Sequence, residues 1–135
     1  MNKIFFCPPT GEILEAPDLF EIQQVIFNSN PDFWKQGSGD AGLHYDGSGD
    51  QLIFQFVESR GFCVTHEPST DELPKVLIEE GESEERERVL LSGNPMEVPR
   101  CYFVSPGRAW DAAVTFMKDG VPLAGATWRV FDPKL

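Results

Sequence analysis

Residues 51–58 constrain the fold more than any other part of the sequence. Apolar side chains at positions 52, 54 and 56 recur with a period of two, which predicts a strand with one face on a core. Ser59-Arg60-Gly61 then forms a turn, and residues 62–66 predict a second strand paired with the first. Since an isolated hairpin is barely stable in water, the rest of the chain must supply further strands and a covering layer.

Several other segments have the composition of short strands. They are residues 3–7, 42–45, 84–92, 96–104 and 127–131. Pro99 interrupts one of them, which indicates an edge position or a bulge, because proline cannot donate to a ladder. For residues 70–78 we expect a helical turn.

Two helices complete the expected fold. Residues 16–28 form the first, with Pro17 in its first turn and an apolar stripe of Leu19, Ile22, Val25, Ile26 and Phe27. The second begins after a capping Ser105 and ends at Gly120, and its expected buried face is Ala109, Trp110, Ala113, Phe116 and Met117. The sequence therefore predicts an α+β fold in a single domain, residues 1–135. About six mostly antiparallel strands form a sheet that carries two main helices on one face.

The charge of the chain limits its partners. Twenty-two acidic residues stand against eleven basic ones, a formal net charge of −11. Such a surface repels phosphate backbones and anionic lipid, so we expect neither nucleic acid nor a membrane as partner. It attracts basic proteins, although acidity also serves solubility alone.

The cysteines and the N-terminus indicate a cytoplasmic location. The chain has an odd number of widely spaced cysteines, Cys7, Cys63 and Cys101. This pattern is typical of free thiols in a reducing compartment. The first apolar run, Ile4–Cys7, is shorter than the roughly 7–15 residues of an export signal.

No pattern in the sequence calls for a cofactor or a metal. Gly37-Ser38-Gly39-Asp40 recurs as Gly47-Ser48-Gly49-Asp50, and we interpret both as turns that flank one short strand. The second copy begins like a calcium loop, but Gln51 and Val57 stand where that loop needs Gly and Glu. Cys63 and His66 lie three apart on one strand, so they point to opposite faces and cannot share a metal.

The densest local feature is a run of acids at positions 79, 80, 82, 84, 85 and 87. Three interpretations remain open: a solvated loop, a docking surface for a basic protein, and a carboxylate pair in catalysis. The third needs burial and a cleft that separate the two pKa values.

The segment from Tyr102 to Trp128 resembles immunity family 1 of bacterial polymorphic toxin systems. That family ends with a strand, a capped helix that begins near an Ala, a Phe-Gly-Pro stretch and a closing Trp. The matching positions here are Ala109, Ala112, Phe116, Gly120 or Val121, Pro122 and Trp128. The resemblance implies a cytoplasmic antitoxin that binds a cognate toxin domain, often a nuclease or deaminase, and blocks its active site. No catalytic residues transfer, because such proteins are not enzymes.

These observations define a functional hypothesis. The chain is expected to be an immunity protein, a monomer or weak homodimer, whose partner is a basic toxin domain. We expect the interface to use exposed aromatics and acids, namely Trp34, Asp40, Tyr45, Asp46, Asp50, Glu79, Glu80 and Glu82. The alternatives are a small cytoplasmic enzyme or ligand-binding domain, and a generic acidic adaptor.

Overall fold

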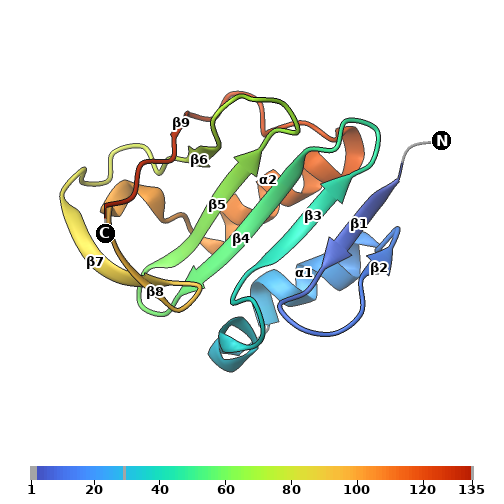
Figure 1. Cartoon of the computed structure of the whole chain (residues 1–135), viewed down its shortest axis with the longest axis horizontal. Helices are drawn as coiled ribbons and strands as arrows, with labels where there is room; N and C mark the ends of the chain where they lie inside the picture. The colour runs from blue at the N-terminus through green and yellow to red at the C-terminus, as the bar shows by residue number, and fades with distance from the viewer. Residues whose placement is uncertain (1–2, 29, 135) are drawn as a thin grey trace.

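Seven strands form one sheet in which every neighbouring pair is antiparallel. The computed structural model describes residues 3–28 and 30–134. The order across the sheet is β2-β1-β3-β4-β5-β6-β9 (Figure 1). The strands are β1 (Ile4–Cys7), β2 (Leu14–Glu15), β3 (Ala41–Tyr45), β4 (Gln51–Val57), β5 (Gly61–Glu67), β6 (Lys75–Leu77) and β9 (Trp128–Val130).

The predicted hairpin is the centre of this sheet. In β4 and β5, Phe54 pairs with Val64 and Phe56 with Phe62, whose ring centroids lie 5.1 Å apart. Cross-strand pairs of this kind stabilise an antiparallel ladder and fix its register. Four consecutive residues of β5, 62–65, are buried, because both faces of this strand are covered.

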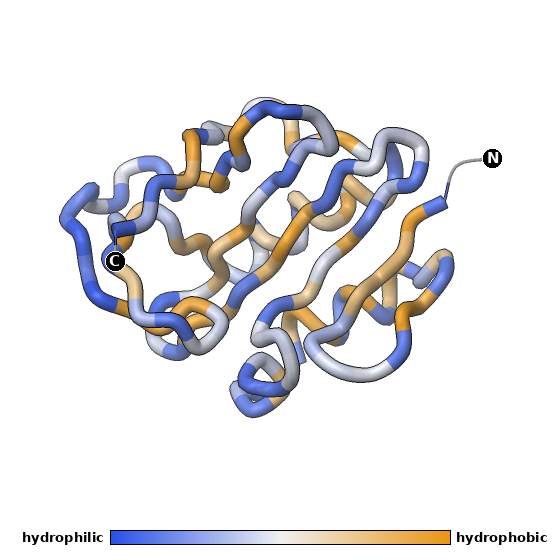
Figure 2. Tube along the Cα trace, in the orientation of Figure 1, coloured by the Kyte–Doolittle hydropathy of each residue, from blue (hydrophilic) through white to orange (hydrophobic). Residues whose placement is uncertain are grey.

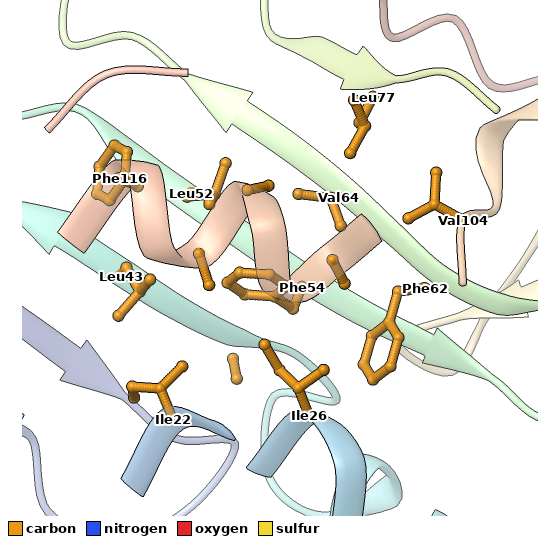
Figure 3. Packing of buried hydrophobic residues seen from close by; sticks show 14 of the residues in the cluster. Ile22, Ile26, Leu43, Leu52, Phe54, Phe62, Val64, Leu77, Val104 and Phe116 are labelled. Atoms are coloured by element: carbon orange, nitrogen blue, oxygen red, sulfur yellow. The ribbon is translucent and has the colours of Figure 1, made fainter. Parts of the chain in front are cut away.

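Both helices, α1 (Leu19–Asn28) and α2 (Pro106–Asp119), pack on one face of the sheet. Ile22 and Ile26 of α1 join the alanines and Phe116 of α2 against Leu43, Leu52 and Phe54. Figure 3 shows these side chains gathered between the helices and the strands. The α+β fold with helices on one side of a mostly antiparallel sheet is therefore confirmed.

Local capping explains where the helices begin and end. Ser105 accepts a hydrogen bond from the Arg108 amide, and Gly120 ends α2 at φ 68°, as predicted. In α1, Asp18 and Glu21 exchange side-chain-to-amide bonds of 2.8 and 3.2 Å, a reciprocal cap. Since the cap is Asp18, α1 begins at Leu19 rather than at residue 16.

The opposite face of the sheet is partly covered by a separate hairpin. Within residues 3–28 and 30–134, strands β7 (Arg86–Leu91) and β8 (Asn94–Pro99) form a two-stranded sheet of their own. Their inward side chains build a second core with Cys63 of β5 and Val76 of β6. We expected these two segments to belong to the one sheet; instead they form a second layer (Figure 1).

Two further expectations were wrong in detail, and one short helix was not expected. Lys75–Leu77 is strand β6, not a helical turn, and it pairs with both β5 and β9. Strand β8 ends at Pro99, and Arg100–Tyr102 is the 3-10 helix η2. Pro31–Lys35 forms another 3-10 helix, η1, whose first amides bond to the Asn30 side chain.

The two Gly-Ser-Gly-Asp turns have a shared structural role. Each turn is hydrogen-bonded to a serine of another segment. The Gly39 carbonyl accepts a hydrogen bond of 3.2 Å from the Ser92 hydroxyl, and the Ser48 carbonyl accepts one from the Ser69 hydroxyl. A Cβ at Gly39 would lie 2.8 Å from the Ser92 Cα, so the glycine permits this approach. The interpretation as turns that flank β3 is confirmed, and the first of them anchors the tip of the β7–β8 hairpin.

Candidate functional site

The acidic loop, residues 79–85, connects β6 to β7 and carries five carboxylates at positions 79, 80, 82, 84 and 85. Four of these side chains are exposed and that of Glu79 is half-buried. Figure 2 shows the hydrophilic run that leads from this loop into β7. The loop is thus a solvent-facing acidic surface rather than a cleft.

Backbone hydrogen bonds hold the acidic loop in one conformation. The Glu79 amide donates to the Cys101 carbonyl at 2.8 Å, and the Cys101 amide donates to the Ser83 carbonyl at 2.9 Å. The Arg100 amide donates to the Glu85 carbonyl at 3.0 Å. Because the loop is tied along its length to residues 100 and 101, its carboxylates are presented from a fixed backbone.

Some carboxylates of this loop already have partners. Glu84 forms an ion pair with Arg129 at 2.6 Å, and Glu80 accepts a hydrogen bond from the Thr127 hydroxyl. Glu82 bonds the Ser83 amide next to it. Beyond the loop, Glu87 of β7 lies between Arg60 and Arg100, which neutralise it. The loop therefore has more acids than local bases, and Glu79, Glu82 and Glu85 make no ion pair within residues 3–28 and 30–134.

The aspartates of the predicted interface do not form one group. Asp40 precedes β3, whereas Asp46 and Asp50 lie in the turn at the other end of that strand. The Asp46 carboxylate accepts a hydrogen bond of 2.6 Å from the Lys3 amide, and the Asp40 carboxylate accepts one of 3.0 Å from the Ser38 hydroxyl. Since β3 separates Asp40 from the other two, a single small patch cannot use all three.

The two predicted aromatic anchors are not exposed. Trp34 is 5% exposed and packs edge-on against Phe33 and Phe62, with ring centroids 5.2 Å away in both cases. Tyr45 is half-buried, and its ring lies against Gly120 at the end of α2. The sequence placed both residues in polar, Gly-rich surroundings, which hid their contacts with distant apolar side chains.

An open groove of about 500 Å³ lies beside Trp34. One wall is Phe56, Val57 and Glu58 at the end of β4, and the other is Leu90 with the Ser92-Gly93 hairpin tip. Leu90 is 63% exposed and contributes an apolar side chain to the lining of the groove. No local pattern in the sequence indicates this groove, because its lining comes from three segments far apart in the chain, within residues 34–39, 56–58 and 90–93.

A histidine and an aspartate pair at the other end of the sheet. His66 Nε2 lies 3.2 Å from Asp50 Oδ2, and the Ser69 amide donates to Asp50 Oδ1 at 2.9 Å. The His66 ring also lies edge-on to the rings of Phe116 and Trp128, with a distance of 6.4 Å between ring centroids in both cases. Burial raises the pKa of the Asp50 carboxyl, but the Ser69 amide and the His66 charge together outweigh it, so the pKa lies below its ordinary 3.8.

This pair predicts an acid-dependent loss of stability. Because the folded-state pKa of Asp50 is below its unfolded value, the carboxylate stabilises the fold above the unfolded pKa. That contribution disappears as the pH falls through the folded pKa. Urea unfolding from about pH 5 to about pH 3 should show a steeper loss of unfolding free energy for the wild type than for Asp50→Asn. Parallel curves for the two proteins would rule out the coupling.

The cysteines are free, as expected. Burial raises the pKa of the Cys63 thiol to about 12, so this thiol is inert at neutral pH. Cys63 belongs to the second core while His66 faces the helices, which confirms that they point to opposite faces. In residues 3–28 and 30–134, no three His, Cys, Asp or Glu side chains are gathered as metal ligands would be.

In the part of the chain that the structure describes, no helix has the length and apolar character needed to cross a bilayer. No protein-family model matches the chain, and no curated protein sequence matches it.

Proposed function

We propose that this chain is an immunity protein. It binds a cognate toxin domain with a basic surface, a nuclease or deaminase, and blocks the toxin's active site. The observation that carries the proposal is the acidic loop: a solvent-facing row of carboxylates on a backbone held by hydrogen bonds. The resemblance of residues 102–128 to immunity family 1 gives the same partner class.

The fixed backbone of the acidic loop favours binding over simple solvation. A flexible acidic tail would lose conformational freedom on binding, whereas this loop has already lost it on folding. Its carboxylates therefore approach a partner in a set geometry. An enzyme that acts on phosphates carries a basic cleft, and an acidic loop of this kind fits such a cleft by charge.

The net charge of −11 supports the same proposal at longer range. Opposite net charges accelerate encounter by orders of magnitude at low ionic strength, and salt removes most of the gain. At about 0.15 M salt the screening length is roughly 8 Å, so the residual effect comes from acids near the interface.

The decisive experiment is complex formation with the toxin domain encoded beside this chain's gene. We expect the double variant Glu80→Lys/Glu82→Lys to associate about tenfold or more slowly than the wild type near 10 mM salt. Stopped-flow association rates at low and physiological salt measure this difference, and toxin activity assays measure protection.

The matched control is Asp111→Lys/Asp119→Lys, which changes the net charge equally on the exposed side of α2. Because its charges lie away from the acidic loop, we expect a smaller effect on the rate. If both double variants associate at the wild-type rate, the acidic loop is not the docking surface. If the wild type forms no complex and gives no protection, the immunity function itself is wrong.

A further inference from the structure

The outer edge of β7 carries unpaired backbone groups. The β7–β8 hairpin closes with a two-residue turn, Ser92-Gly93, at φ 50° and 82°, and Leu91 pairs with Asn94. In such a hairpin the pair that closes the turn is hydrogen-bonded, and bonded and non-bonded pairs then alternate. The amides and carbonyls of Leu91, Val89 and Glu87 therefore face β8, and those of Leu90, Arg88 and Arg86 face away from it.

The neighbouring strand confirms this alternation. Glu97 stands opposite Arg88, and its amide and carbonyl bond outward to Lys134 at 2.6 and 2.9 Å. Pro95 and Pro99 occupy the other outward positions of β8 and have no amide hydrogen to offer. The outer edge of β8 is thus closed, as exposed sheet edges in natural proteins generally are. The outer edge of β7 has neither proline nor a paired strand in residues 3–28 and 30–134.

The groove beside Trp34 lies at this open edge. Leu90 is both an outward-facing position of β7 and a wall of the groove, and Phe56 and Val57 form the opposite wall. An extended segment that pairs with Arg88 and Leu90 would place a side chain next to Leu90, over the groove. Backbone hydrogen bonds and a side-chain pocket thus occur together, as in known cases of strand addition.

The charges around this edge differ from those of the rest of the chain. Arg88 and Lys35 are exposed, and neither forms an ion pair within the described residues. Arg60 and Arg100 lie close by on Glu87. Three acids lie among these four basic side chains: Glu87 between the two arginines, Glu97 opposite Arg88, and Glu58 in the groove wall. In a chain with twice as many acidic as basic residues, this small local excess of positive charge makes the edge the more favourable place for an acidic side chain.

We propose that the outer edge of β7 binds an extended segment of a partner protein by strand addition. The segment carries an apolar side chain that enters the groove between Leu90 and Phe56. Two residues along, on the same face, it carries an acidic side chain opposite Arg88. The site differs in charge and position from the acidic loop, and it holds whether or not the partner is a toxin.

Synthetic peptides test this site without the toxin. The probe is a short Thr/Val peptide with Phe at its centre and Asp two residues later. In NMR titrations we expect it to shift and protect the amides of Arg88 and Leu90. N-methylation of the peptide amides that face β7 should abolish binding, and replacement of Phe by Ala should weaken it strongly. Equal binding by the N-methylated peptide, or shifts confined to other residues, would overturn strand addition.

A charge exchange tests the orientation. Arg88→Glu should weaken the Asp peptide about two- to fivefold and strengthen its Lys counterpart by a similar factor, as a cross-strand pair does. Arg108→Glu, on α2, is the matched control and should change neither. If Arg88→Glu leaves the preference unchanged, the acidic specificity is wrong. If the peptide-free protein protects its Arg88 and Leu90 amides in proportion to its concentration, a second copy covers the edge and the proposal fails.

Discussion

Phe116→Ala should lower the free energy of unfolding by about 3–5 kcal/mol. Phe116 is 0% exposed and sits on the inner face of α2, against the sheet residues of the first core (Figure 3). Its removal leaves a cavity between helix and sheet that rigid strands cannot close. Chemical denaturation followed by circular dichroism measures the change.

Two variants bracket this expectation. Phe20→Ala on α1 removes a ring that is 65% exposed, so it should cost well under about 1 kcal/mol. Trp110 is half-buried and contacts Phe27 at 6.3 Å, so Trp110→Ala should fall between the two. The sequence assigned Trp110 the same depth as Phe116, and the structure corrects that. An unchanged unfolding midpoint for Phe116→Ala would mean that α2 buries a different face.

Gly61→Ala should be nearly as damaging, although it adds only one methyl group. Gly61 has φ +114°, and a Cβ there would lie 2.5 Å from the Val104 carbonyl oxygen. The Val104 carbonyl oxygen cannot easily move away, because it accepts a hydrogen bond of 2.9 Å from the Phe62 amide. Backbone strain of about 1–2 kcal/mol and crowding of about 1–3 kcal/mol add to a loss of roughly 2–5 kcal/mol.

Gly81→Ala separates these two contributions. Gly81 has φ +83°, but nothing lies within 4 Å of the position where its Cβ would be. Thermal and urea unfolding of both variants should therefore show a smaller loss for Gly81→Ala, limited to the backbone strain. Equal losses would show that the Val104 contact is not rigid.

The sequence predicts those elements whose signals are local. Ser105, Pro106 and Gly120 mark both ends of α2, since capping depends only on neighbouring residues. The β4–β5 hairpin is equally local, because its alternation and its turn lie within one segment. The free cysteines and the turn role of the Gly-Ser-Gly-Asp repeats follow from the same kind of pattern.

The sequence fails where a distant segment decides the structure. Lys75–Leu77 is too short to show a period, and it becomes a strand because β5 and β9 lie on either side of it. The strands predicted at residues 84–92 and 96–104 correspond to β7 and to β8, although β8 ends at Pro99. Neither segment indicates in its sequence that the two form a second layer. That outcome depends on Cys63 and Val76, which make the far face of the sheet apolar.

The candidate site shows the same division. The acidic loop is visible as composition, and the structure adds that its backbone is fixed by residues 100 and 101. The sequence predicts an exposed Trp34, because glycines and aspartates surround it. Its burial results from Phe62, a residue of the distant strand β5, and no local pattern indicates such a contact.

The strand order of the large sheet also determines the sequence of events in folding. Strands β3, β4, β5 and β6 are consecutive in the chain and adjacent in the sheet, so they form by closing short loops. Strand β1 reaches β3 only across α1, and β9 reaches β6 only after the β7–β8 hairpin and α2 are made. The central meander is therefore expected to form early, with the two flanking strands added last. Amides of β4 and β5 should then exchange with solvent only through global unfolding, while β1 and β9 open locally and exchange sooner.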